Sequence, residues 1–288
     1  MPFPLAHPAA VLPFRRFCPR HLSFAALLMG SIVPDLAYAM DDLNKFSATV
    51  AFSLGRWAEN LIYVREAWDW DDFSHSWIGS ILFDLPVALV LFAVYLALRS
   101  ALTTLLPNPH RVALRPLCAQ PAPGFRSIVG SLLIGIWLHV GWDYFTNGDR
   151  WAGPWGVLHF QLFAVGSNHL EVYRGIWWCS TLGGMAALLI AYRHFLGRRE
   201  LPLWSFRREE AKYYGLWLVM LLLSAVIAAP LTLRFIQPGP SLRDLFGFIH
   251  RFSGYFLTSL CSMIALLALY RKIISRSESQ PRAANDRQ

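Results

Sequence analysis

The sequence contains few charged residues and few cysteines. Of its 288 residues, 15% are charged, against roughly 25% in an ordinary soluble domain. Hydrophobic residues make up 55% and the mean hydropathy is +0.39. This composition excludes an intrinsically disordered chain and argues against a soluble globular one. The four cysteines form no Cys-x-x-Cys pair, which argues against a disulfide framework or a cysteine-based zinc site; they are Cys18, Cys118, Cys179 and Cys261.

Several catalytic motifs are also missing from the sequence. It has no Gly-x-Ser-x-Gly, no phosphate-binding glycine loop and no His-Glu-x-x-His. The sequence therefore gives little support for a serine hydrolase, a P-loop nucleotidase or a metalloprotease of the His-Glu-x-x-His type. Hydrolysis by a metal-activated water molecule remains an alternative, because this mechanism requires no nucleophilic side chain.

The net charge is +8 and the isoelectric point is near 9.6. In a soluble protein such a balance would suggest nucleic acid as a partner. Cytoplasmic loops of membrane proteins, however, also collect Lys and Arg, and Trp and Tyr gather at membrane interfaces. With 12 Trp and 10 Tyr in the chain, we predict the lipid bilayer as the partner, and no nucleic acid.

Six apolar segments approach the length of about 20 residues that a bilayer core requires. They are residues 22–39, 77–98, 128–145, 176–196, 214–235 and 248–270. Lys and Arg concentrate in the N-terminus, in alternate loops and in the C-terminal tail, whereas most Asp and Glu lie in the other loops. This alternation predicts an all-α polytopic membrane bundle of about six helices with both termini cytoplasmic.

The first apolar segment has a second interpretation. Arginines precede it and an Ala-Tyr-Ala sequence ends it at residues 37–39, as in a cleaved signal peptide. Against cleavage, Pro34 and Asp35 stand where a signal peptide favours small neutral residues. Both interpretations stay open at the level of the sequence.

Ionisable residues inside the predicted spans are functional candidates, because burying a charge in the bilayer costs several kcal/mol. His139 and Asp143 are four residues apart, so they share one helix face. They would either bind one cation together or hydrogen-bond to hold the helix in register. Asp84 follows His75 by nine residues, which at 100° per residue places it on the opposite face, as a contact between helices.

The candidates also share one depth in the predicted bundle. Asp35 lies roughly 20 Å along its span, and His139 and Asp143 lie roughly 17 and 22 Å along theirs, at a rise of about 1.5 Å per residue. Both spans run in the same direction, towards the outer face, and His75 precedes its span on that side. We therefore expect four donors from three helices to meet at one level. His7 joins them only if residues 8–17 fold back as a short helix, and spacing alone equally allows an interfacial histidine.

Four short patterns occur in a fixed order. They are His-Pro in PFPLAHPAAVLPFRRF, Pro-Asp in SIVPDLAY, His-Ser in FSHSWIGSILFDLPVAL, and His-x-x-x-Asp in LHVGWDYFTN. In this order the chain resembles, over roughly its first 195 residues, a bacterial family of membrane proteins designated domain of unknown function 4184. A similar order marks inner-membrane metal-dependent hydrolases, which are distantly similar to zinc-dependent phospholipase C.

The resemblance implies a ligand set for one or two divalent ions: His7, Asp35, His75, His139 and Asp143. Zinc is the first expectation and manganese the second, because the donors mix imidazole and carboxylate. The implied function is a hydrolase acting on an ester or phosphoester, with a lipid-like substrate, at the outer side of the bacterial inner membrane. Asp35 and Asp143 would serve as catalytic carboxylates.

Two other functions and a division of the chain complete the expectations. A transporter or proton relay could use the same Asp and His residues, and a non-catalytic membrane scaffold could use them to lock helices together. Residues 1–196 are expected to form the family-like membrane domain with the metal site. Residues 197–272 would add two further spans, and residues 273–288 a disordered tail. The oligomeric state stays open.

Overall fold

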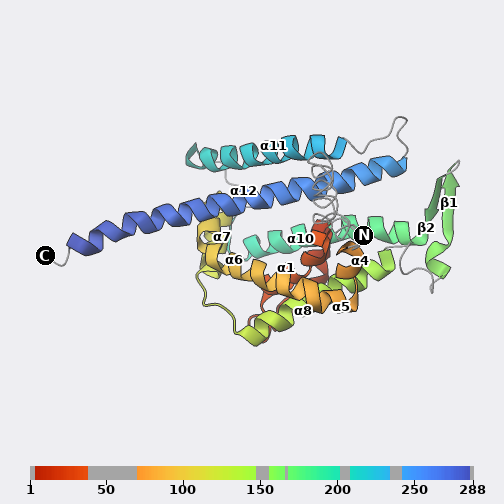
Figure 1. Ribbon diagram of the computed structural model, residues 1–288, viewed down its shortest axis with the longest axis horizontal. Helices are drawn as coiled ribbons and strands as arrows, with labels where there is room; N and C mark the ends of the chain where they lie inside the picture. The colour runs from red at the N-terminus through yellow and green to blue at the C-terminus, as the bar shows by residue number, and fades with distance from the viewer. Residues whose placement is uncertain are drawn as a thin grey trace, which may run out of the picture. The chain divides into compact units, whose positions relative to one another are not determined.

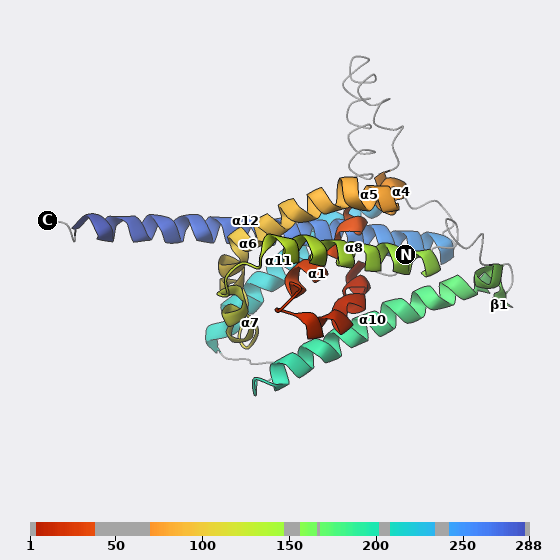
Figure 2. The ribbon, with the colours of Figure 1, turned by 90° about the horizontal axis from the view of Figure 1, so that it is seen from below.

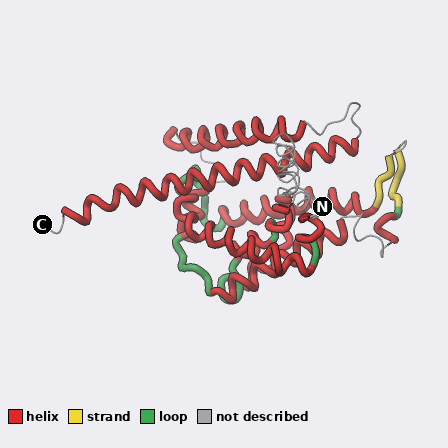
Figure 3. Tube along the Cα trace, viewed as in Figure 1, coloured by secondary structure: helices red, strands yellow, loops and turns green. Residues whose placement is uncertain are grey.

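The computed structural model describes residues 4–37, 70–146, 156–165, 168–201, 208–233 and 242–285, and nearly all of them are helical (Figure 3). This confirms the helical class. Apart from turns and loops, the described residues contain an antiparallel hairpin of β1 (Gln161–Val165) and β2 (Asn168–Glu171), which the sequence did not predict. It stands between the helices α8 (Phe125–Thr146) and α10 (Val172–Gly197).

Five helices are long and apolar enough to cross a membrane. They are Trp77–Thr104, Phe125–Thr146, Val172–Gly197, Arg208–Leu233 and Arg251–Ser275. They coincide with the second to sixth predicted spans, which confirms these five as membrane-like helices. Their apolar side chains are widely exposed, as lipid contact requires: Leu82, Ile190 and Val226 are each more than 60% exposed.

The first predicted span is shorter than expected. The helix α1 (Phe24–Gly30) gives way to a 3-10 turn, η2 (Val33–Asp35), so this apolar helical stretch covers Phe24–Asp35, about 18 Å. Pro34 explains the break, because it has no N–H to continue an α-helical ladder. The expected count of six full spans is therefore not reached in the described residues. The predicted end of this span, with Tyr38 and Ala39, lies outside them.

The chain divides into two compact units. Unit 1 comprises residues 1–92 and 123–194, and unit 2 comprises residues 93–122 and 195–288. One boundary falls inside α6 (Leu85–Thr104) and another near the end of α10. In unit 2, α12 (Leu242–Asn285) continues into the segment for which the sequence predicts disorder.

In unit 1, the N-terminal segment folds back as a 3-10 helix, η1 (Pro4–Phe17), against α1 and α8. The helices α1 and α8 lie side by side (Figure 1). Their backbones touch at two glycines: a Cβ on Gly30 would collide with the carbonyl oxygen of Leu132, and one on Gly135 with that of Leu27. Such small residues allow close helix approach in membranes, and here they fix the end of α1 against the middle of α8.

In unit 2, α11 (Ala211–Leu233) runs along α12, and the buried side chains Leu98, Leu105 and Ala268 form an apolar core. A short helix, α7 (His110–Cys118), occupies part of the proline-rich loop that the sequence predicts to be irregular. Beside α7 lies the buried carboxylate of Glu210, on the 3-10 turn η5 (Arg208–Glu210).

Glu210 is fully satisfied by its neighbours. Its Oε1 accepts hydrogen bonds from Arg111 Nη2 and Asn108 Nδ2, both at 2.8 Å, and its Oε2 accepts one from the backbone N–H of Asn108 at 3.0 Å. A buried charge with this many partners holds α7 to the start of α11.

Candidate metal centre

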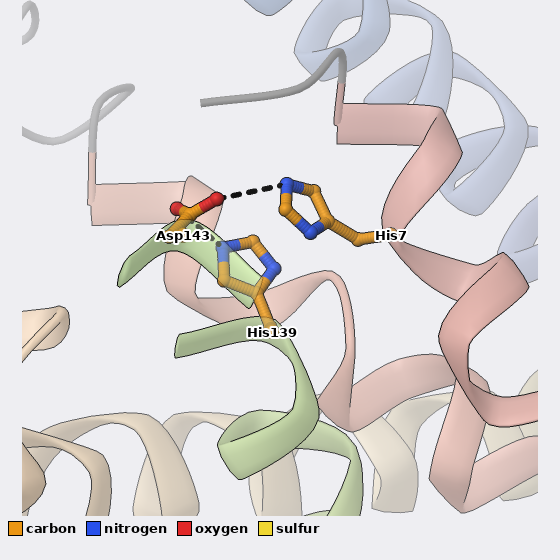
Figure 4. Close-up of side chains that lie close together, drawn as sticks. All are labelled: His7, His139 and Asp143. Atoms are coloured by element: carbon orange, nitrogen blue, oxygen red, sulfur yellow. Dashed lines mark ion pairs between the residues drawn. The ribbon is translucent and has the colours of Figure 1, made fainter. Parts of the chain in front are cut away.

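The structure brings all five predicted donors together in unit 1. His7 comes from η1, and Asp35 ends η2. His75 lies in the turn between α4 (Trp70–Ser74) and α5 (Trp77–Gly79), and His139 and Asp143 lie one turn apart on α8. None of the five residues is more than 8% exposed. Figure 4 shows His7, His139 and Asp143 facing one another.

Three donor atoms of this cluster form a nearly equilateral triangle. His75 Nε2 lies 3.3 Å from both His139 Nε2 and Asp143 Oδ2, and the latter two atoms are 3.4 Å apart. Ligand atoms about 2.0–2.1 Å from a tetrahedral zinc ion are about 3.3–3.4 Å from one another. The triangle therefore has the dimensions of one face of a coordination tetrahedron.

A backbone contact fixes the tautomer of His139. Its Nδ1 lies 2.9 Å from the carbonyl oxygen of Ser31, at the end of α1. A carbonyl oxygen only accepts hydrogen bonds, so Nδ1 carries the proton. In the neutral ring, Nε2 then presents its lone pair to the cluster. This arrangement, with the second ring nitrogen held by an outer partner, is typical of metal-binding histidines.

Asp35 and His7 complete the cluster around the triangle. Asp35 Oδ1 lies 3.7 Å from His139 Nε2. His7 Nε2 lies 3.5 Å from Asp143 Oδ1, and the His7 ring stacks on that of His139 with centroids 3.8 Å apart. Burial, and next the neighbouring His139, hold the pKa of His7 well below its usual value. His7 is therefore neutral at pH 7, which is the form that binds metals.

Hydrogen bonds from the described residues satisfy only part of this cluster. Within the described part of the chain, five of its buried atoms have no hydrogen-bond partner: His7 Nδ1 and Nε2, Asp35 Oδ1 and Oδ2, and Asp143 Oδ2. Most buried polar atoms in proteins are hydrogen-bonded, and an unsatisfied one costs about 1–3 kcal/mol. The atoms Nε2 of His75, Nε2 of His139 and Oδ2 of Asp143 face one another, and mixed imidazole and carboxylate donors are those that bind zinc or manganese. These buried groups can hold a metal ion.

Asp84 lies closer to the cluster than the sequence indicates. His75 is in a turn, and residues Ser80–Asp84 form a π-helical turn, η3. The two residues are therefore not on one regular α-helix, and a rotation of 100° per residue does not give the angle between His75 and Asp84. The Ser74 hydroxyl lies within hydrogen-bond distance of Asp84 Oδ1 at 2.8 Å and of the Pro34 carbonyl at 3.1 Å. The prediction of an opposite face is therefore wrong, whereas the predicted role as a contact between segments fits. Asp84 thus contacts the residue directly before His75, and the hydroxyl of that residue also lies against the residue directly before Asp35.

Sequence reasoning missed the partners that orient the donors. The carbonyl of Ser31 leaves no trace in a sequence pattern, because any residue supplies one. The role of Ser74 could have been suspected only from its place next to His75. Cleavage of a signal peptide after residue 39 would remove His7 and Asp35, and thus two of the five donors.

Comparison with known proteins places the chain in one family. The family model described as a domain of unknown function (DUF4184) matches residues 1–239. This range contains all five donors and extends past α11. No curated protein and no solved structure matches the chain. The distant similarity to metal-dependent hydrolases therefore stays a prediction. The chain belongs to the DUF4184 family.

Proposed function

We propose that the protein is a membrane-embedded, metal-dependent hydrolase of an ester or phosphoester. The observation that carries the proposal is the triangle of His75, His139 and Asp143, with unsatisfied buried donors on His7 and Asp35 around it. A purely structural cluster would be expected to satisfy its own atoms. We expect one or two divalent ions there, with zinc first and manganese second.

The proposed topology has six membrane segments with both termini in the cytoplasm of a bacterium. The chain would lie in the inner membrane, because its basic loops alternate with acidic ones. The short α1–η2 segment would enter the bilayer as one of the six. Its partner α8 is a full-length candidate span, and the donors lie near the end of both. The centre would then face the outer side of the membrane.

The chemistry follows from the donor set. A divalent ion held by these residues would lower the pKa of a bound water and polarise the carbonyl or phosphoryl oxygen of the substrate. Asp35 and Asp143 have carboxylate oxygens inside the cluster that can take a proton from the attacking water. The water oxygen would form a bond to the carbon or phosphorus atom, the ester bond would break, and the leaving oxygen would receive a proton.

The proposal is tested with purified protein loaded with zinc or with manganese. We expect hydrolysis of chromogenic carboxylic esters or phosphate diesters that a chelator abolishes and metal restores. The His75→Ala variant should lose both the metal and the activity, whereas His194→Ala should keep both, because His194 is an exposed residue near the end of α10. A wild-type protein that binds metal but hydrolyses neither substrate class would contradict the proposal.

A proton relay is the second candidate, and one observation favours it. His7, Asp143 and His75 form a chain with steps of 3.5 and 3.3 Å, short enough for proton transfer through small rearrangements. In that case the wild-type protein would be free of metal, and proton flux in sealed vesicles would disappear in Asp143→Asn. The scaffold alternative predicts neither metal nor flux.

A further inference from the structure

A large cavity lies directly beside the metal centre. It has a volume of about 730 Å³ and is bounded by η1, α10 and Trp142 of α8. Figure 2 shows the N-terminal segment, in red, between α8 and α10. His7 is part of the cavity wall and at the same time part of the donor cluster. His7, whose side chain is fully buried, is therefore shared by the cavity wall and the donor cluster.

The wall of the cavity is built from small and apolar residues. Apart from His7 and Ser180, it consists of Gly, Ala, Val, Ile, Trp and one Cys, and it has no charged side chain among the described residues. Two glycines of α10 shape the space: a Cβ on Gly183 would meet nothing within 4 Å, whereas one on Gly184 would lie 2.9 Å from the carbonyl oxygen of Ala6, where η1 approaches α10. Such a wall offers hydrophobic contact along its length and almost no hydrogen-bonding groups. It therefore fits a hydrocarbon ligand.

The dimensions of the cavity fit a single hydrocarbon chain. Its lining on α10 extends from Val172 to Ala187, a distance of about 22 Å at the rise of an α-helix. One leaflet of a bilayer core is about 15 Å thick. Because α10 is long and apolar enough to span a membrane, this wall would lie at the depth of lipid acyl chains. The volume is within the range of small-molecule sites.

We propose that this cavity binds the acyl chain of a lipid ester and presents its ester or phosphoester group to the metal centre at His7. This inference rests on the proposed function and specifies its substrate class.

The test is photolabelling with a diazirine derivative of palmitic acid, read by mass spectrometry of the α10 peptide. The wild-type chain should be labelled within residues 172–187. Gly183→Leu should lower that labelling at least about tenfold, because displacing two methylene groups already accounts for that factor. Gly215→Leu is the matched control: Gly215 is an exposed helical glycine of α11 with open space around it, and its variant should be labelled like the wild type.

The failure of this inference is distinct from the failure of the proposed function. Metal content of the same samples reports on the donor cluster. If the protein contains no metal and Gly183→Leu loses the labelling, the cavity binds an acyl chain but the protein is not a metal-dependent hydrolase. If the protein contains metal but α10 is not labelled, or is labelled equally in Gly183→Leu, the proposal that the cavity binds an acyl chain is wrong. Absent labelling together with cross-linking of Cys179 between two copies would assign the cavity to a second copy instead.

Discussion

The two units bury ionisable groups in opposite ways. In unit 2, both carboxylate oxygens of Glu210 accept hydrogen bonds, from Arg111 and Asn108. In unit 1, both carboxylate oxygens of Asp35 are buried without a hydrogen-bond partner among the described residues. Protein atoms thus satisfy the first carboxylate, whereas no hydrogen bond from the described residues satisfies the second. A satisfied buried charge indicates a structural role, and an unsatisfied cluster of donors indicates a ligand.

Among the variants that test this contrast, His139→Ala should have the largest effect, which is on the amount of bound metal. His139 Nε2 is a corner of the donor triangle and its ring is fully buried. We expect His139→Ala to lose its divalent ion completely, measured by elemental analysis of the purified protein. The variant His194→Ala, with an exposed histidine replaced, should keep the wild-type content. Equal metal content in both variants would show that His139 of α8 is not a metal ligand.

Removing Glu210 should affect stability without affecting metal. The Glu210→Ala variant leaves Arg111 and Asn108 without their shared acceptor, and breaking such a buried pair costs about 3 kcal/mol. A lower apparent Tm in detergent with unchanged metal content is the expected result. Glu209→Ala, at the exposed neighbour, should leave both values near those of the wild type. A loss of metal in Glu210→Ala would mean that the two clusters are not independent.

Asp84 should affect metal affinity through Ser74. Outer-shell partners of metal ligands typically contribute 10–100-fold to affinity, so we expect Asp84→Ala to weaken zinc binding about tenfold in competition titrations. Asp84→Asn should retain most of the affinity, because its amide oxygen can still accept the hydrogen bond from Ser74.

The pathway through Ser74 has its own control. Ser74→Ala should give a loss similar to that of Asp84→Ala, and the double variant should lose no more than either single one, because the two residues act on the same contact. Fully additive losses would show that Asp84 acts on the donors by another route.

The smallest expected effect is that of Asp35→Asn on stability, and its sign should depend on whether metal is bound. In the metal-free protein, Asp35→Asn removes an unsatisfied buried charge, and we expect a slight stabilisation, on the order of 1 kcal/mol. With zinc present, the same variant should be less stable than the wild type, because it has lost a donor. Thermal unfolding with and without metal measures both values. Destabilisation in both conditions would show that Asp35, like Glu210, has a structural role.

The sequence predicts the membrane-like helices well because their signal is local and long. The second to sixth spans correspond to helices of 22 residues or more. It fails at the first span, where one residue, Pro34, ends an otherwise apolar segment. It also fails at Asp84, because a π-helical turn changes the helical phase and no side-chain pattern marks such a turn.

The convergence of the donors could be predicted only in part. Spacing on α8 and equal depth along two helices indicated His139, Asp143, Asp35 and His75. Spacing left His7 undecided, because its approach depends on how η1 folds back against α1 and α8. The carbonyl of Ser31 and the cavity along α10 depend on backbone packing, which no single-residue pattern encodes.

The most direct test of the central claim is the divalent metal content of purified wild-type protein after incubation with zinc or manganese and removal of the free ion. The account predicts one or two bound ions per chain, held by imidazole nitrogen and carboxylate oxygen at about 2.0–2.2 Å in X-ray absorption spectra. A folded protein that retains no ion, or one whose ion has sulfur ligands, would contradict it.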